Sequence, residues 1–226
     1  MEGYLYGIDM QSENYGEVRR PVLYFKGCSL NCSWCHVNDL KSVAGSCILE
    51  SDDQDEKYRM TLEQVMQKLN CQEWTDEQKK IGVVLAGGEL LLQTSFAMAI
   101  IKELKKMEIY VGVETTGNAP AEDFNQVAPL ADVLYWDLKL YDPVKHKQMT
   151  KADNQQVVQN FKWAAQQELP VLAKIQVLHG VNEKEKDARQ YVRFLKEIGV
   201  KKVALQGMFS RQYAIIFQRA GMLKNL

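Results

Sequence analysis

Short apolar runs alternate along this chain with longer segments whose apolar residues recur at helical spacing. Runs of the first kind are typical of buried strands, and the segments between them predict helices. Repeated strand–helix units favour a parallel sheet with helices packed outside it. Six units are too few for a closed eight-stranded barrel, so the pattern predicts an incomplete barrel or an open doubly wound sheet. The predicted strands are residues 21–25, 81–86, 109–113, 133–138, 171–178 and 202–205.

Local signals mark where several of the predicted helices begin. Thr61 and Gln64 have the spacing of a capping box, in which each residue bonds the other's backbone amide. Pro120 suits the first turn of a helix, and Asn154 can cap another.

Polar and glycine-rich motifs come directly after three of the predicted strands. Gly87-Gly88-Glu89 follows the second strand, Glu114-Thr115-Thr116-Gly117 the third, and Asp137-Leu138-Lys139 closes the fourth. In parallel α/β folds the carboxyl ends of the strands meet at one rim, where ligands bind. The sequence therefore predicts a single site at this rim.

Composition and charge narrow the function classes. The chain has 226 residues, 46% hydrophobic and 25% charged, which fits one domain over residues 1–226. The net charge is −1 with no basic block, so we expect no nucleic-acid partner. No run approaches the roughly 20 apolar residues of a membrane span, and no basic, apolar signal segment opens the chain. Five cysteines, an odd number, predict a reducing cytoplasmic location rather than a disulfide framework.

Three of those cysteines, Cys28, Cys32 and Cys35, follow the first predicted strand as C-x3-C-x2-C. Such a cluster predicts metal ligation. Iron–sulfur clusters usually take four thiolates, so three ligands would leave one iron open for chemistry. The alternative is a structural zinc site with His36 or a distant cysteine as fourth ligand. Cys47 and Cys71 stand apart, and we expect them to be ordinary thiols.

The cysteine triplet resembles the signature of the radical S-adenosylmethionine (SAM) enzymes. Phe25-Lys26-Gly27-Cys28 and Trp34-Cys35-His36 resemble one branch, the activating enzymes of glycyl radical enzymes. The resemblance implies an incomplete, six-stranded (β/α)6 barrel and a [4Fe–4S] cluster on the three cysteines. The fourth iron of such a cluster chelates SAM, with Trp34 and His36 beside the cofactors.

The second motif, Gly87-Gly88-Glu89, resembles the G-G-E motif whose backbone contacts the SAM amino group in this family. Glycines at a strand end let backbone groups approach a ligand closely. The resemblance implies cofactor contacts from Gly87 and Gly88, with Glu89 as a supporting carboxylate. Family members usually continue with proline, whereas this chain has Leu90.

The third and fourth motifs resemble the E-T-x-G-x-x-P and D-x-K stretches of the activating enzymes. By that resemblance, Lys139 neutralises the SAM carboxylate, Asp137 accepts from the ribose, and Thr115 lies at the cofactor. In some relatives the same strand ends bind a monovalent cation, which here implicates Glu114, Thr115 and Asp137. The match continues through His146 and Asn154, which we expect to be surface or cap residues.

Two stretches depart from the family pattern. Residues 15–20 replace an Asp-Gly-Pro-Gly-Ile-Arg type stretch, although Arg20 is kept. Gln206-Gly207-Met208-Phe209 replaces the usual Leu-Pro-Tyr-His, so the SAM-contacting histidine of the family is missing. These departures affect SAM contacts and partner identity rather than the cluster.

The main functional hypothesis is an anaerobic activating enzyme. The resemblance implies that an electron from flavodoxin or ferredoxin cleaves SAM, and that the 5′-deoxyadenosyl radical takes hydrogen from a glycine of a partner glycyl radical enzyme. We expect a monomer with one cluster and no inserted ferredoxin-like domain, because only Cys47 and Cys71 lie between the triplet and Gly87. The alternatives are a small-molecule radical SAM enzyme similar to 7-carboxy-7-deazaguanine synthase, and a non-enzymatic zinc-binding module.

Overall fold

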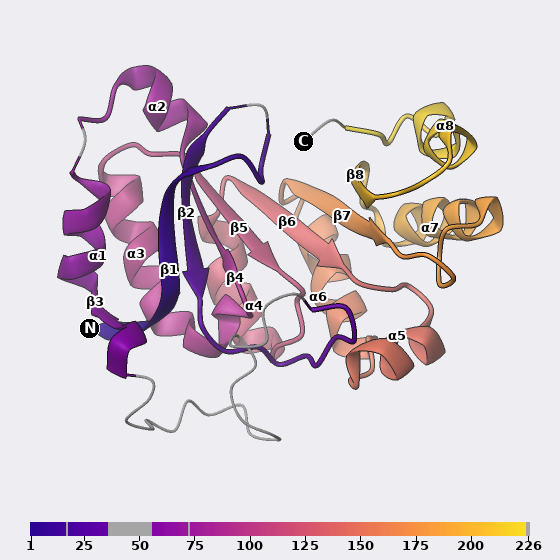
Figure 1. Cartoon of the computed structure of the whole chain (residues 1–226), viewed down its shortest axis with the longest axis horizontal. Helices are drawn as coiled ribbons and strands as arrows, with labels where there is room; N and C mark the ends of the chain where they lie inside the picture. Colours follow the sequence, from indigo (N-terminus) through magenta and orange to yellow (C-terminus); the bar gives the residue numbers. More distant parts are fainter. Residues whose placement is uncertain (17, 36–55, 72, 225–226) are drawn as a thin grey trace.

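The computed structural model describes residues 1–16, 18–35, 56–71 and 73–224. Within them one sheet of eight strands has the order β3-β1-β2-β4-β5-β6-β7-β8 (Figure 1). The run from β2 to β8 is parallel, whereas β1 pairs antiparallel with both β2 and β3. The strands are β1 (Glu2–Ser12), β2 (Arg20–Phe25), β3 (Arg59–Thr61), β4 (Val83–Gly87), β5 (Val111–Thr115), β6 (Val133–Leu138), β7 (Val171–Val177) and β8 (Lys202–Gly207).

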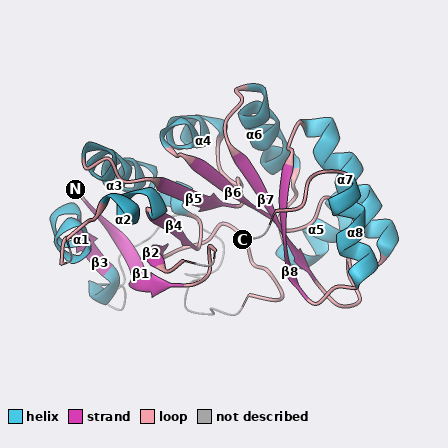
Figure 2. Cartoon of the chain, turned by 90° about the horizontal axis from the view of Figure 1, so that it is seen from above, coloured by secondary structure: helices cyan, strands magenta, loops and turns pink. Residues whose placement is uncertain are grey.

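Helices connect the parallel strands and cover one side of the sheet. Figure 2 shows the sheet as an arc from β1 to β8, with α3, α4, α6 and α7 along its outer side. Three short 3-10 helices, η2 (Glu56–Tyr58), η3 (Leu90–Gln93) and η4 (Ala128–Leu130), complete the connections described. The α-helices are α1 (Leu62–Leu69), α2 (Asp76–Ile81), α3 (Thr94–Lys106), α4 (Ala121–Val127), α5 (Pro143–Thr150), α6 (Gln155–Gln166), α7 (Glu185–Ile198) and α8 (Arg211–Arg219).

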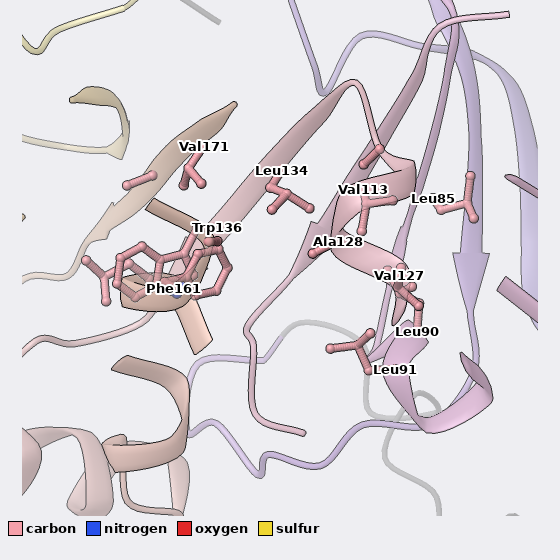
Figure 3. Close-up of a cluster of buried hydrophobic side chains, with 14 of the residues drawn as sticks. Leu85, Leu90, Leu91, Val113, Val127, Ala128, Leu134, Trp136, Phe161 and Val171 are labelled. Carbon is pink, nitrogen blue, oxygen red and sulfur yellow. The ribbon is translucent and has the colours of Figure 1, made fainter. Parts of the chain in front are cut away.

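The main hydrophobic core lies between the outer face of the sheet and these helices (Figure 3). Leu134, Trp136 and Leu138 of β6 all belong to it. The Trp136 ring stacks on Phe161 of α6 with centroids 4.1 Å apart. Because side chains alternate across a strand, the residues between them face the other side of the sheet.

A second, smaller cluster lies on the inner face of the arc. It joins Tyr15, from the loop after β1, to four side chains of β2, β4 and β6: Val22, Val84, Ala86 and Tyr135. The Tyr15 and Tyr135 rings meet with centroids 5.1 Å apart. The loop after β1 therefore covers part of the concave face with its aromatic side chain.

The predicted incomplete six-stranded barrel is confirmed. The six predicted strands correspond to β2 and β4 to β8, with ends that differ by up to two residues. Strands β1 and β3 were not predicted, because β1 is interrupted by Gly3 and Gly7 and its burial does not alternate regularly. Ile81 ends α2 rather than starting β4, since Gly82 terminates the helix at φ +77°.

Capping predictions met mixed outcomes. The Thr61–Gln64 capping box is confirmed, and α4 begins directly after Pro120. Asn154 stands at the N-cap of α6, but the cap bond is absent there; its amide instead donates to the Leu140 and Tyr141 carbonyls at 3.2 and 2.9 Å. Expecting His146 at the surface was wrong, because the side chain is buried.

Two further observations concern the whole described chain. Cys71, at the end of α1, is exposed, while Cys47 lies outside the described residues. None of the helices in the part of the chain that the structure describes has the length and apolarity needed to cross a membrane.

Candidate active site

The cysteine loop leaves β2 and is held by backbone bonds from two distant segments. The carbonyls of Phe25 and Gly27 accept from Gly88 N at 2.9 Å and Glu89 N at 2.7 Å. Further along, Asn31 N donates to Thr150 O and Ser33 N to Met149 O, both at 2.9 Å. The last turn of α5 therefore fixes the middle of the loop, which accounts for the position of this helix beside the rim.

Cys28, Cys32 and Cys35 line one cavity at the carboxyl ends of the parallel strands. Among the described residues these three side chains and Cys71 form no disulfide. The wall also includes side chains or backbone from β4 to β7. The remaining lining residues are Leu30, Trp34, Gly87, Gly88, Glu114, Thr115, Thr116, Asp137, Lys139 and Gln176.

Gly87 and Gly88 bring the end of β4 against the cysteine loop. Gly87 has φ +113°, a conformation that L side chains rarely adopt. A Cβ on Gly88 would lie 1.8 Å from the Gly27 carbonyl oxygen, closer than atoms can approach. The glycine pair is therefore required for the wall of the cavity to close beside Cys28.

Glu89 lies behind that wall and does not line the cavity. Its carboxylate is fully buried and accepts from Thr115 Oγ1 at 2.6 Å, and from the amide and hydroxyl of Thr116 at 3.0 and 2.6 Å. Burial raises the pKa of Glu89, although the threonine hydrogen bonds oppose the shift. Its place agrees with a supporting carboxylate that holds the loop after β5.

Two ion pairs lie on the concave face of the sheet, beside the cavity. Lys139 Nζ contacts the carboxylate of Asp137, the penultimate residue of β6. Burial alone would lower the pKa of Lys139, but the Asp137 carboxylate, and then Cys32, outweigh it and the pKa is raised. The ammonium therefore stays charged and faces the cysteines as a positive group.

The second ion pair joins β5 to β7. Lys174 Nζ lies 2.6 Å from Glu114 Oε2, and only 6% of the lysine side chain is exposed. The Tyr15 hydroxyl donates to the same carboxylate oxygen, and Lys174 Nζ lies 4.5 Å from the centroid of the Tyr15 ring. Burial, together with the Glu114 charge, raises the pKa of Tyr15, which keeps its hydroxyl a donor.

The three thiols suit a multi-iron cluster better than a single ion. Across the described residues, no group of three His, Cys, Asp or Glu side chains has the arrangement of one metal-ion site. A four-iron cluster takes one thiolate per iron, so its ligands stand around it rather than at one point. Burial raises the pKa of the Cys28 thiol to about 12, and metal coordination deprotonates such a thiol.

Most residues predicted for the site are brought together. Trp34, Thr115, Asp137 and Lys139 line the cavity with the cysteines and glycines, while His36 lies outside the described residues. Each residue expected around a cation already has a protein partner: Glu114 contacts Lys174, Asp137 contacts Lys139, and the Thr115 hydroxyl donates to Glu89.

Sequence reasoning missed Lys174 and Gln176, which belong to β7. A charged residue inside an apolar strand is costly without a partner, and Lys174, within the predicted strand 171–178, carried that signal. Gln176 lines the cavity two residues later, on the same face of the strand. Nothing in the sequence marked Tyr15 as a partner of Glu114 and Lys174, because this residue lies in a loop without a regular pattern.

Comparisons with known proteins agree with this geometry. The isethionate sulfite-lyase activating enzyme of Desulfovibrio desulfuricans is 28% identical over 86% of this chain and 79% of its own length. A domain of the pyruvate-formate lyase-activating enzyme from Bacteroides vulgatus superposes with a TM-score of 0.58. It is 26% identical, over 63% of this chain and 97% of that domain.

The fold extends over nearly the whole chain. QueE from Escherichia coli covers 99% of this chain and 93% of its own, with a TM-score of 0.60 at 14% identity, which shows the shared fold alone. The family model of the radical SAM superfamily, enzymes that use a [4Fe–4S] cluster and SAM, matches residues 22–205. This chain therefore belongs to the radical SAM superfamily.

Proposed function

We propose that this chain activates a partner glycyl radical enzyme by taking a hydrogen atom from one of its glycines. The similarity to activating enzymes extends over most of the chain, and the convergence of Cys28, Cys32 and Cys35 on one cavity supports the same chemistry. When bound and reduced, the cluster would give one electron to SAM, so that a sulfonium C–S bond breaks into methionine and a 5′-deoxyadenosyl radical, which would take the glycine hydrogen and leave as 5′-deoxyadenosine.

The three cysteines are the proposed cluster ligands. Backbone hydrogen bonds to the segment after β4 and to the end of α5 hold their loop, which supports a loop that is ordered without a cluster. Preorganisation of this kind keeps ligands in place without further ordering on binding. We expect one cluster of about four irons per chain.

Lys139 is the proposed partner of the SAM carboxylate. Its ammonium has three donors, so it can keep its contact with Asp137 while it binds a carboxylate. Asp137 is the proposed acceptor for the ribose hydroxyls. Backbone groups beside Gly87 and Gly88 are the proposed contacts of the amino group. Thr115, Trp34 and His36 complete the proposed contacts, with Glu89 in support.

We further propose that flavodoxin or ferredoxin donates the electron and that the enzyme acts as a monomer in the cytoplasm. The short single domain carries one cluster. An anaerobic protein with reduced flavodoxin, SAM and a candidate glycyl radical enzyme should then give a glycyl radical signal by electron paramagnetic resonance.

The decisive test compares two cysteine variants after anaerobic reconstitution with iron and sulfide. Cys28→Ala should lose the cluster absorbance and all 5′-deoxyadenosine formation, because it removes one of the proposed ligands. Cys71→Ala is the matched control, since that thiol is exposed and does not line the cavity. It should keep both.

Three outcomes would contradict the proposal. Equal 5′-deoxyadenosine from native protein and Cys28→Ala would remove the cluster assignment. Zinc at one per chain without iron would favour a binding module. Cleavage of SAM without a glycyl radical on any candidate partner, but with turnover of a small molecule, would favour a small-molecule radical SAM enzyme.

A further inference from the structure

Glu114, Thr115 and Asp137 have the residue types of a monovalent cation site, but each of them already has a protein partner. Glu114 Oε2 contacts Lys174 Nζ at 2.6 Å, and Asp137 contacts Lys139 Nζ. The Thr115 hydroxyl donates to Glu89 at 2.6 Å and accepts from Gly117 N at 2.9 Å. A metal cation at these residues would compete with a lysine ammonium for each carboxylate and with two hydrogen bonds for the hydroxyl.

Charge balance leads to the same conclusion. Asp137 and Lys174 are register partners on β6 and β7, so the two ion pairs lie next to each other on neighbouring strands. The four side chains carry two negative and two positive charges. Buried charges are stable when paired, and an added cation would leave one positive charge without a partner.

Lys174 is held where a cation would be stabilised. Its side chain is almost fully buried, with the carboxylate of Glu114 on one side and the face of Tyr15 within the range of a cation–π contact. Tyr15 also donates to Glu114, which fixes the carboxylate opposite the ammonium. Because the ammonium is part of the chain, no free energy is needed to bind an ion from solution.

We infer that Lys174 takes the place of a monovalent metal cation beside Glu114, so that this protein needs neither K⁺ nor Na⁺ at its cavity. The inference contradicts the cation contacts that the sequence suggested for Glu114, Thr115 and Asp137. The inference concerns residues at the wall of the cavity that holds the proposed cofactor site. It does not depend on whether the partner is a glycyl radical enzyme.

The test is thermal unfolding of the protein without cofactors in KCl, NaCl or choline chloride at equal ionic strength. Choline is too large for a site that fits an ammonium. Native protein should have the same Tm in all three salts. Lys174→Met leaves Glu114 without its cationic partner, with only the Tyr15 hydroxyl donating to it, so the Tm of the variant should be lower in choline and partly restored by K⁺ or Na⁺.

The matched control is the double variant Glu114→Gln with Lys174→Met, which removes both charges. Its Tm should again be the same in the three salts. A native Tm that is higher in K⁺ or Na⁺ than in choline would overturn the inference, as would a Lys174→Met variant without cation response. If Lys174→Met does not fold in any salt, the native series alone decides between the two outcomes.

Activity gives a separate readout. Formation of 5′-deoxyadenosine by the reconstituted native enzyme should not change when choline replaces K⁺, and a requirement for K⁺ would contradict the inference. Failure of the proposed glycyl radical chemistry would leave the thermal series unaffected, so the two proposals fail independently.

Discussion

The two faces of the same sheet have opposite chemistry, and a single strand contributes to both. On β6, Trp136 points outward into the helix-covered core, whereas its neighbours Tyr135 and Asp137 belong to the inner face. The outer face is a continuous apolar layer. The inner face combines a small aromatic patch with two ion pairs and three thiols, so stability and chemistry are divided between them.

This division follows from the period of two in a strand. Because neighbouring residues face opposite sides, a substitution at one position can alter packing while the next alters the cavity. The comparison therefore predicts that outer-face variants lose free energy of unfolding but keep the cluster ligands in place. Inner-face variants should lose cofactor binding for a smaller loss of stability.

The largest expected loss of stability comes from Trp136→Ala. Trp136 has no exposed surface and stacks on Phe161, so truncation leaves a large cavity in the core. We expect the free energy of unfolding to fall by about 3–5 kcal/mol, measured by urea unfolding of the protein without cofactors.

Met208→Ala is the control for this experiment, because Met208 is 88% exposed and its truncation should change stability by about 0.5 kcal/mol or less. Folded Trp136→Ala should still take up iron. Loss of iron uptake in the folded variant, or a loss of stability no larger than the control, would show that the two faces are not separate.

A smaller effect on stability, with a direct effect on the cavity, is expected from Glu89→Ala. This substitution removes the acceptor of four hydrogen bonds. The donors are Thr115 Oγ1, the amide and hydroxyl of Thr116, and Leu91 N. Unsatisfied buried donors predict a loss of about 1–3 kcal/mol in the free energy of unfolding. SAM binding should weaken, since these threonines line the cavity, while the three cysteines still hold iron.

Glu89→Gln retains one carbonyl oxygen and should lose less. The measurements are urea unfolding and SAM binding at equilibrium, with iron content as the reference. If Glu89→Ala bound SAM with native affinity, the loop after β5 would not depend on this carboxylate, and Glu89 would belong with the core rather than with the site.

The fold was largely predictable from the sequence, but the ion pairs were not. The parallel strands from β2 to β7 are recognisable as apolar runs because most of their residues are buried. Strands β1 and β3 gave no such signal, since β3 is a three-residue edge strand and β1 pairs with it only over Glu2–Tyr4. Gly3 in β1 is there for packing: a Cβ would lie 2.1 Å from the Phe96 ring.

The pairing of charges depends on geometry that residue types do not contain. Asp137 is in register with Lys174, yet it contacts Lys139 while Lys174 reaches Glu114 across β6. The motifs predicted which residues meet at the rim. They did not predict which acid each lysine would neutralise, and that choice is the basis of the inference about the cation.

The smallest effect we predict is a pH dependence of the free energy of unfolding that comes from His146. It bears on the comparison of the two faces because α5, which carries His146, holds the cysteine loop. The His146 Nδ1 lies 2.9 Å from Ala152 O and 3.1 Å from Thr150 Oγ1, and the Thr150 carbonyl holds Asn31. Burial lowers the pKa of His146 below 6.5, against weaker opposing hydrogen bonding.

A histidine whose folded pKa is lowered binds fewer protons in the folded state than in the unfolded state. Its contribution to stability is therefore present above about pH 6.5 and is lost as the pH falls through the folded pKa. Urea unfolding should give a free energy that falls more steeply below pH 6.5 for native protein than for His146→Gln, which does not titrate. Parallel pH profiles would mean that His146 is protonated without cost, and the end of α5 would then hold the cysteine loop independently of this side chain.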